Sequence, residues 1–207
     1  MITFGLPKGR LADQVVDALG DIGPVRTDGR ELVVAGRVEG VRFLLLKPPD
    51  VPAYVARGVA DLGVAGLDVL REHPADVLEP VTTSLGRCRL SLCGRPGSDL
   101  EARMREDGLR VATKYPRMAG EALSRRGLVA ELIPLHGSVE LAVVVDLADA
   151  IVDLVETGAT LRAHGLVEYA TLAEVSARVV VNRASYALQR EALAPFLERL
   201  GRCDVGR

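Results

Sequence analysis

The chain has few aromatic residues, few cysteines and no long apolar run. Phe, Tyr and Trp make up 3% of its 207 residues and Trp is absent, so Leu, Val and Ala must fill the core. The three cysteines show no C-x-x-C spacing, which predicts neither a disulfide framework nor a zinc site and fits a reduced, cytoplasmic protein. No apolar run approaches the roughly 20 residues of a membrane helix, and the N-terminus does not resemble a secretion signal.

Net charge is also small. The 26 basic and 28 acidic residues give a formal charge of -2, which argues against a nucleic-acid partner, because phosphate-backbone binding needs a basic face. The three histidines, His73, His136 and His164, are scattered along the sequence. They form no cluster at metal-ligand spacing, so we expect no fixed metal site on the protein.

Short β-rich runs alternate with amphipathic segments, which favours an α/β fold with largely parallel sheets. The strands that we expect are 2–6, 32–34, 41–46, 61–66, 87–93, 109–113, 129–135 and 176–182. The helices that we expect are 11–19, 54–58, 119–126, 147–155 and 187–200, while 138–145 fits either type. The break at 94–98, rich in glycine and proline, is the best candidate for a crossing between two lobes.

The most informative stretch is DAIVDLVETGATL, residues 149–161. We expect a helix with Asp149 and Asp153 one turn apart, followed by a loop of small and hydroxyl residues. Such a loop lets the backbone approach a phosphate, and the carboxylates would bind ribose hydroxyls or substrate-chelated magnesium. The other interpretation is a helix end capped by Gly158 with an N-cap at Thr157 or Thr160, and the short T-G-x-T pattern does not decide between them.

Cationic residues follow several of the predicted strands. Lys8, Gly9 and Arg10 come directly after the first strand, where parallel α/β sheets collect their ligands, and two cations around a glycine suit a polyphosphate. A solvated loop before a helix is the alternative. Asp68 follows the 61–66 strand and equally fits a helix cap. Taken together, the cationic strand ends predict an anionic ligand.

These stretches jointly resemble the ATP phosphoribosyltransferase family. The resemblance covers nearly the whole chain in the family's order, and its last piece is highly specific. The matching pieces are LPKGRL (6–11), KPPDVPAYVARGVADLGVAGLDVL (47–70), GRCRL (86–90), ATKYP (112–116), HGSVELA (136–142) and LADAIVDLVETGATLRAHGL (147–166). The resemblance implies transfer of the phosphoribosyl group of phosphoribosyl pyrophosphate to N1 of ATP, giving phosphoribosyl-ATP and pyrophosphate in the first step of L-histidine biosynthesis.

The resemblance also implies a two-lobed, periplasmic-binding-protein-like α/β fold with a central cleft. Lobe I would comprise residues 1–93 with 174–207 returning to it, and lobe II, residues 94–173, would carry the phosphoribosyl pyrophosphate loop. The chain looks like the family's short form, which implies a histidyl-tRNA-synthetase-like regulatory subunit in a hetero-octamer and a homodimer of catalytic chains. We expect a cytoplasmic location, with no nucleic-acid or membrane partner.

Residue roles follow from the same resemblance. Asp149 and Glu140 are the candidates for stabilising an oxocarbenium-like transition state, and magnesium would arrive chelated by the substrate. The residues expected to bind phosphoribosyl pyrophosphate are Asp149, Asp153, Glu156, Thr157, Gly158, Ala159 and Thr160. The residues expected on the ATP and pyrophosphate side are Lys8, Gly9, Arg10, Lys47, Asp68 and Arg87.

Three positions depart from the family pattern. Lys47 stands where the family usually has Arg, Val143 where it has Pro, and Asp146 where it has Gly. A competing interpretation is a non-catalytic solute- or effector-binding domain of the same architecture, because fold alone does not separate the two. The T-G-A-T loop and the missing export signal favour the enzyme.

Overall fold

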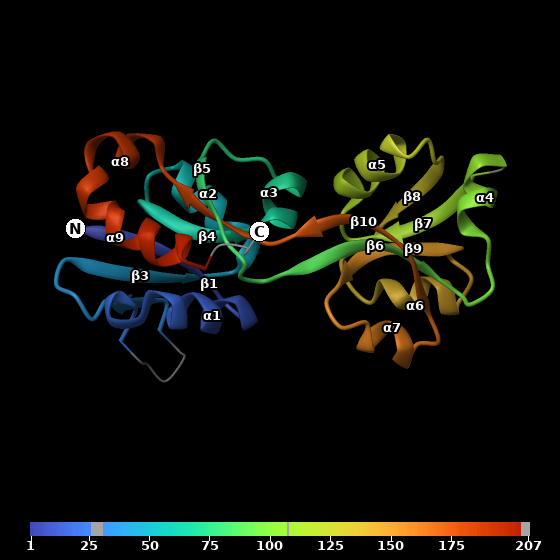
Figure 1. Ribbon diagram of the computed structural model, residues 1–207, viewed down its shortest axis with the longest axis horizontal. Helices are drawn as coiled ribbons and strands as arrows, with labels where there is room; N and C mark the ends of the chain where they lie inside the picture. The colour runs from blue at the N-terminus through green and yellow to red at the C-terminus, as the bar shows by residue number, and fades with distance from the viewer. Residues whose placement is uncertain (26–30, 107, 204–207) are drawn as a thin grey trace. The chain divides into compact units, whose positions relative to one another are not determined.

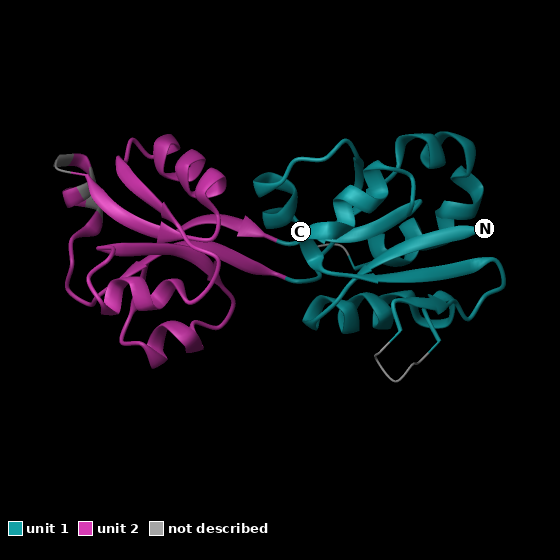
Figure 2. Cartoon of the chain, turned by 180° about the vertical axis from the view of Figure 1, so that it is seen from behind, with its two compact units in different colours: residues 1–86, 176–207 teal, residues 87–175 magenta. Residues whose placement is uncertain are grey.

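The computed structural model describes residues 1–25, 31–106 and 108–203, and the chain forms two compact units (Figures 1 and 2). Unit 1 comprises Met1–Gly86 and Ser176–Arg207, and unit 2 comprises Arg87–Val175. The first crossing lies earlier than the predicted division at 93/94, because the strand Cys88–Gly94 pairs with strands of unit 2. The return crossing lies two residues beyond the predicted start of the C-terminal segment at 174.

Unit 1 is built on a six-stranded mixed sheet in the order β2-β3-β1-β4-β11-β5. Its central strands β3, β1 and β4 are parallel, while β2, β11 and β5 pair antiparallel with their neighbours. The strands are β1 (Ile2–Pro7), β2 (Val33–Ala35), β3 (Val41–Leu46), β4 (Leu62–Gly66), β5 (Leu78–Thr82) and β11 (Ala177–Val181).

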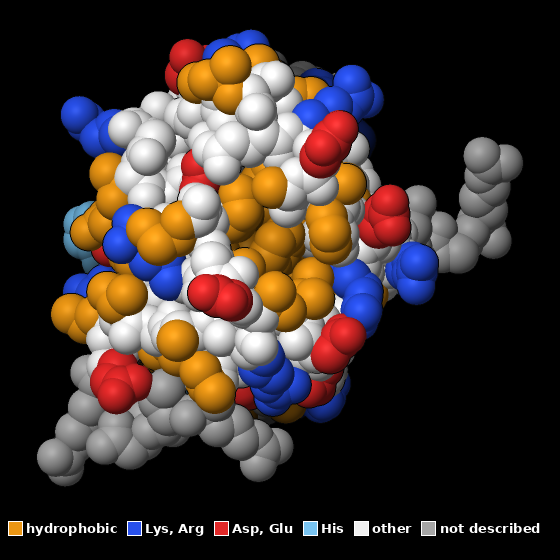
Figure 3. Space-filling model, turned by 90° about the vertical axis from the view of Figure 1, so that its left-hand side faces the viewer, with side chains coloured by type: hydrophobic (Ala, Val, Ile, Leu, Met, Phe, Trp, Pro, Cys, Tyr) orange, Lys and Arg blue, Asp and Glu red, His pale blue; other side chains and the backbone are white. Residues whose placement is uncertain are grey.

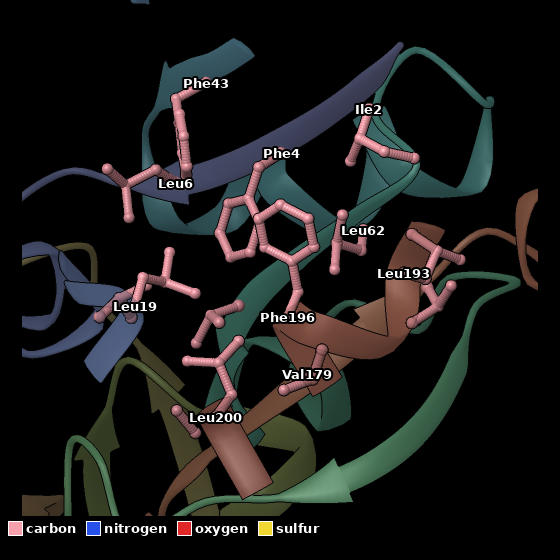
Figure 4. Packing of buried hydrophobic residues seen from close by; sticks show 14 residues of the cluster. Ile2, Phe4, Leu6, Leu19, Phe43, Leu62, Val179, Leu193, Phe196 and Leu200 are labelled. Atoms are coloured by element: carbon pink, nitrogen blue, oxygen red, sulfur yellow. The ribbon is translucent and has the colours of Figure 1, made fainter. Parts of the chain in front are cut away.

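Helices cover both faces of this sheet (Figure 1). Even-numbered β1 residues such as Phe4 face α1 and α9, where the Phe4 ring lies 5.2 Å from Phe43 and 5.9 Å from Phe196 between centroids (Figure 4). The opposite face packs against α2 and α3. The helical segments of unit 1 are α1 (Arg10–Leu19), η1 (Gly20–Ile22), η2 (Pro48–Asp50), α2 (Val51–Ala56), α3 (Leu67–Glu72), α8 (Arg183–Leu188) and α9 (Arg190–Gly201).

Unit 2 has a five-stranded mixed sheet in the order β10-β6-β9-β7-β8, with β9, β7 and β8 parallel. Helices α6 and α7 share one apolar cluster with β9, and α4 and α5 also pack on the sheet. The strands are β6 (Cys88–Gly94), β7 (Leu109–Thr113), β8 (Ala130–Pro134), β9 (Ala150–Val155) and β10 (Val167–Val175). The helices are α4 (Leu100–Glu106), α5 (Pro116–Arg125), α6 (Val139–Val144) and α7 (Ala159–Ala163).

Most predicted strands are confirmed, and β2 pairs antiparallel with β3. The sheets are mixed rather than largely parallel, because the chain leaves and re-enters unit 1 through strands that run against their neighbours. The predicted closing helix 187–200 is two helices, α8 and α9. Strands β5 and β10 were not expected. Among the described residues, no helix is both long and apolar enough to span a membrane.

Candidate active site

The carboxyl ends of three parallel strands of unit 2 form the first candidate site. Lys114 follows β7, the segment 156–160 follows β9, and the turn into α6 follows β8. Because β7, β9 and β8 are parallel neighbours, these three segments reach the same edge of the sheet. The edge therefore collects a cation, an acidic helix start and a loop rich in small residues.

The predicted helix over 147–155 is wrong, because Ala150–Val155 is the central strand β9. Neighbouring strands and helices cover both of its faces, so its apolar residues run almost continuously and show no strand alternation. The four-residue spacing of Asp149 and Asp153 is also that of two residues one turn apart on a helix, which is why the sequence favoured a helix. In a strand, that spacing separates the two residues by about 13 Å along the axis.

Asp153 lies near the carboxyl end of β9 and is 9% exposed. Its Oδ2 lies 3.8 Å from the Lys114 Nζ, and its Oδ1 accepts a hydrogen bond from the Leu154 backbone amide at 2.8 Å. Burial raises the pKa of the Asp153 carboxyl, with a further upward contribution from Glu140 that Lys114 opposes. Lys114 is a cation that the sequence analysis left outside the site.

Glu140 lies in the first turn of α6 and is half-buried. Ser138, the residue directly before α6, holds a left-handed backbone conformation with φ of 47°, which turns the chain into the helix. Glu140 follows β8 and Asp153 lies near the end of β9, so both belong to the carboxyl edge of this sheet. Across the described residues, no three His, Cys, Asp or Glu side chains gather as metal ligands.

The segment 156–160 comprises the turn 156–158 after β9 and the first two residues of α7, and all of it except the partly buried Gly158 is exposed. Gly158 has a φ of 70°, a conformation that other residues rarely adopt, and a Cβ built there would lie 3.2 Å from the Arg162 Nη1. That guanidinium folds back to donate to the Thr157 carbonyl oxygen at 3.1 Å. The hydroxyl-bearing residues Thr157 and Thr160 lie on either side of the glycine and are exposed.

Asp149 lies at the opposite end of β9 from this turn. Its carboxylate accepts hydrogen bonds from the Arg110 backbone amide at 3.0 Å and from the Arg110 guanidinium at 3.3 Å, with Arg103 at 3.9 Å. The bond from Arg110 lowers the pKa of Asp149. By strand geometry, Asp149 lies about 20 Å from Glu156 along the strand, so it does not join the cluster around Asp153.

Unit 1 presents a second carboxyl edge, formed by β1, β3 and β4. The Lys8 backbone amide donates to the Leu46 carbonyl oxygen at 2.7 Å, which keeps β1 and β3 together up to this edge. Gly9 has a φ of 93° and precedes α1, so a glycine is needed there. Lys8, Arg10 and Lys47 are all exposed at the ends of adjacent strands, as the sequence analysis expected.

Asp68 and Arg87, also expected on the ATP and pyrophosphate side, differ in their surroundings. Asp68 lies in the first turn of α3 and is partly buried, and burial raises the pKa of its carboxyl. Its carboxylate accepts hydrogen bonds from the backbone amides of Asp68 and Val69 in the first turn of α3, which is the kind of contact that the capping alternative expects. Arg87 is exposed and is the first residue of unit 2, immediately before β6.

The glycine Gly63 in β4 serves packing rather than ligand approach. A Cβ there would meet the Gly5 carbonyl oxygen at 2.7 Å and the Val51 side chain at 2.8 Å. The close approach at this position is therefore made by the neighbouring strand and by α2.

An apolar pocket of about 330 Å³ lies at the other end of the unit 1 sheet, beside Met1, Val41 and Phe196. Figure 3 views this end, where hydrophobic side chains surround a hollow. Ile2 and Val41 begin their strands, so the pocket is at the amino ends of β1 and β3. It is separate from the cationic edge.

Comparison with known proteins decides the family. The family model described as ATP phosphoribosyltransferase matches residues 47–202. An ATP phosphoribosyltransferase of Geobacillus kaustophilus (strain HTA426) is 45% identical over 204 residues, which cover 97% of this chain and 97% of that protein. The chain belongs to the ATP phosphoribosyltransferase family.

Solved structures agree with this assignment. The ATP phosphoribosyl transferase (HisG:HisZ) complex from Thermotoga maritima contains a chain that is 34% identical, with a TM-score of 0.80 and 98% coverage of both chains. The alkanesulfonate-binding protein SsuA from Xanthomonas axonopodis pv. citri is 15% identical, with a TM-score of 0.57 over 96% of this chain and 72% of that one. This second likeness concerns the fold alone and confirms the periplasmic-binding-protein-like class.

The ATP phosphoribosyltransferase motifs that carried the resemblance fall into two groups in space. In unit 1, LPKGRL and the start of the 47–70 piece lie at the carboxyl ends of β1 and β3. In unit 2, ATKYP, HGSVELA and the 147–166 piece lie around the carboxyl ends of β7, β8 and β9. The site residues named from the resemblance did not include Lys114, Arg89 or Glu168. Both cations lie inside quoted motifs, which is the signal that could have identified them.

Proposed function

We propose that this member of the ATP phosphoribosyltransferase family joins N1 of ATP to C1′ of phosphoribosyl pyrophosphate. The N1 lone pair forms the new N–C bond, the bond between C1′ and the pyrophosphate oxygen breaks, and pyrophosphate leaves with the electron pair. The product is phosphoribosyl-ATP, the first intermediate of L-histidine biosynthesis. The observation that carries this proposal is the 45% identity to an ATP phosphoribosyltransferase across nearly the full length of both chains.

In unit 2, the segment 156–160 binds the 5′-phosphate through backbone amides and the Thr157 and Thr160 hydroxyls. Asp153, rather than Asp149, faces the ribose, because it is the carboxylate on the same edge as this segment. Glu140 and Asp153 favour the positive charge that develops on the ribose ring in the transition state. Lys114 keeps the buried Asp153 carboxylate paired.

In unit 1, Lys8, Arg10 and Lys47 bind the polyphosphate and pyrophosphate charge, with Gly9 allowing close approach. Lys47 supplies a point charge where the family's usual Arg would supply a two-pronged contact. Asp68 and Arg87 complete the set assigned to ATP and pyrophosphate. Magnesium enters chelated by the pyrophosphorylated substrate and helps to neutralise the leaving group.

The catalytic chain works in the cytoplasm with a histidyl-tRNA-synthetase-like regulatory subunit in a hetero-octamer, built on a homodimer of catalytic chains. The HisG:HisZ complex from Thermotoga maritima supports the hetero-oligomer, since its matching chain covers 98% of this one. None of the three cysteines forms a disulfide, which fits a reducing compartment.

The test is synthesis of phosphoribosyl-ATP from ATP, phosphoribosyl pyrophosphate and magnesium, with and without the regulatory subunit, followed by absorbance and mass. We expect product, and we expect Thr160→Val to raise the KM for phosphoribosyl pyrophosphate by about tenfold through loss of one hydroxyl contact to a charged group. Thr82→Val, at an exposed threonine of β5, is the matched control and should leave that KM unchanged. Binding of both substrates without product, even with the subunit present, would instead favour the non-catalytic binding domain.

A further inference from the structure

We infer that Arg89, held in place by Glu168, is a positioning residue that fixes the start of the sugar-phosphate turn 156–160. The inference rests on the proposed function, because the turn must bind the 5′-phosphate for its position to matter. Arg89 belongs to β6, which lies between β9 and β10 in the sheet of unit 2, and Glu168 belongs to β10 (Figure 1). Neither residue has a role in the site described above.

The guanidinium of Arg89 makes contacts in two directions. Its Nε and Nη2 each lie 2.6 Å from an oxygen of the Glu168 carboxylate, a two-pronged ion pair of the strongest geometry. Its Nη1 donates to the Glu156 carbonyl oxygen at 3.2 Å. One planar group therefore joins a fixed carboxylate to the backbone of the turn.

The place of this backbone contact matters. Arg89 pairs with Val155 in the antiparallel ladder between β6 and β9, and Val155 is the last residue of β9. Glu156 is thus the first residue beyond the strand, where the chain turns toward Gly158. A hydrogen bond from Arg89 to its carbonyl sets the orientation of the peptide with which the turn begins.

The carboxylate that holds Arg89 is itself constrained. Glu168 Oε1 also accepts hydrogen bonds from the Ser91 hydroxyl at 2.7 Å and the Thr171 hydroxyl at 3.2 Å. These bonds, with that of Arg89 first among them, lower the pKa of Glu168 to about 2, so it is ionised at any physiological pH. Because three side chains fix the carboxylate, the guanidinium has little freedom to leave the Glu156 carbonyl.

Stability alone does not explain this arrangement. The two-pronged Arg89–Glu168 pair, with side chains 33% and 23% exposed, stabilises the fold by itself, and the bond from Arg89 to the Glu156 carbonyl oxygen is additional to it. A turn held in its binding geometry before the ligand arrives loses less entropy on binding. The physical consequence is tighter binding of the sugar phosphate, with little effect on the other substrate.

The experiment compares Arg89→Lys and Glu168→Gln in the complex with the regulatory subunit. Lysine keeps the charge but cannot bridge the carboxylate and the carbonyl, and glutamine keeps the shape but loses the ion pair. We expect each variant to raise both the KM and the calorimetric Kd for phosphoribosyl pyrophosphate by about tenfold, the usual effect of losing a charged hydrogen bond. The KM for ATP should change by less than about twofold, and the double variant should be no worse than either single one.

A matched pair serves as the control. Arg71 and Glu79 form a similar two-pronged ion pair in unit 1, at 3.1 and 3.4 Å, and Arg71→Lys and Glu79→Gln should leave both substrates unaffected. Parallel losses for both substrates together with a lower thermal midpoint would overturn the inference in favour of a structural role. So would an unchanged affinity for phosphoribosyl pyrophosphate in both Arg89→Lys and Glu168→Gln.

Thr160→Val, measured in parallel, separates this inference from the proposed function. If Thr160→Val weakens phosphoribosyl pyrophosphate binding and Arg89→Lys does not, the turn binds the phosphate and the positioning role is wrong. If neither variant weakens binding while product still forms, both the phosphate assignment of the turn and the positioning role fail. If the wild-type complex forms no product, the proposed function fails.

Discussion

The two ends of β9 carry acidic residues in opposite circumstances. At the amino end, the Arg95 Nη2 lies 2.7 Å from the Asp146 Oδ1, and the Arg110 Nε lies 3.3 Å from the Asp149 Oδ2. At the carboxyl end, Asp153 is buried beside Lys114, 3.8 Å away, and next to an exposed turn. A carboxylate engaged closely by guanidinium groups is stabilised as a structural anion, whereas a buried carboxylate with a looser partner retains capacity for a ligand. The comparison supports the proposed placement of the chemistry at the carboxyl end of the strand, with a structural role for the amino end.

The largest expected effect comes from replacing the aspartate at each end of β9 by asparagine, in two separate variants. Asp153→Asn should lower kcat on the order of a hundredfold, because it removes the carboxylate placed to stabilise positive charge in the transition state. Asp149→Asn should keep kcat within about threefold of the wild type, since its contacts with Arg110 are about 20 Å along the strand from the turn. Steady-state kinetics of the complex with the regulatory subunit measures both.

Thermal unfolding provides the control for this pair. Asp149→Asn should lower the thermal midpoint because it weakens the bonds to Arg110, while Asp153→Asn should not, because it relieves the burial of a charge. A loss of turnover in Asp149→Asn equal to that in Asp153→Asn would contradict the division of β9 into a structural and a chemical end.

A smaller effect is expected from the glycine of the turn. Gly158→Ala forces a side chain into a φ of 70° and toward the Arg162 guanidinium, so the turn must change shape. We expect the KM for phosphoribosyl pyrophosphate to rise by about tenfold, consistent with backbone strain of about 1–2 kcal/mol. The KM for ATP should remain close to that of the wild type.

Gly165 provides a control, because a substitution there introduces backbone strain outside the candidate site. It follows α7 with a φ of 68°, and a Cβ there has nothing within 4 Å. Gly165→Ala should therefore reduce stability by a similar amount while leaving the KM for phosphoribosyl pyrophosphate unchanged. Equal kinetic effects of Gly158→Ala and Gly165→Ala would mean that general loosening of α7, and not the turn, governs substrate binding.

The sequence predicted the positions of turns and strand ends better than the geometry around them. Turn residues such as Gly158 and strand-end cations such as Lys8 were located correctly, because their positions depend on local backbone requirements and on the order of strands. The central strand β9 was mistaken for a helix, because a strand covered on both faces shows no alternation. Because of that single error, the predicted structure placed Asp149 close to the turn.

Contacts between distant strands were out of reach of sequence reasoning. Glu168 lies in β10, an unexpected strand, and its partner Arg89 is 79 positions earlier in the chain. No local sequence pattern predicts such an ion pair, because the pair depends on the strand order β10-β6-β9 in the sheet. The motif containing Arg89 indicated a functional position without indicating what the arginine would hold.

The smallest expected effect tests the structural end of β9. Asp146 stands where the family usually has glycine and has a φ of 58°, which Asp tolerates at a cost of about 1 kcal/mol. The ion pair with Arg95 offsets part of that cost, but both side chains are exposed, at 52% and 74%, so it contributes at most about 1 kcal/mol. Asp146→Gly should therefore change the free energy of unfolding in urea by less than about 1 kcal/mol, toward greater stability, with unchanged kinetics. Asp146→Ala loses the ion pair and keeps the strain, so it should destabilise by about 1–2 kcal/mol. An alanine variant as stable as the glycine variant would show that the left-handed backbone costs nothing at this position, and the ion pair would then need another explanation.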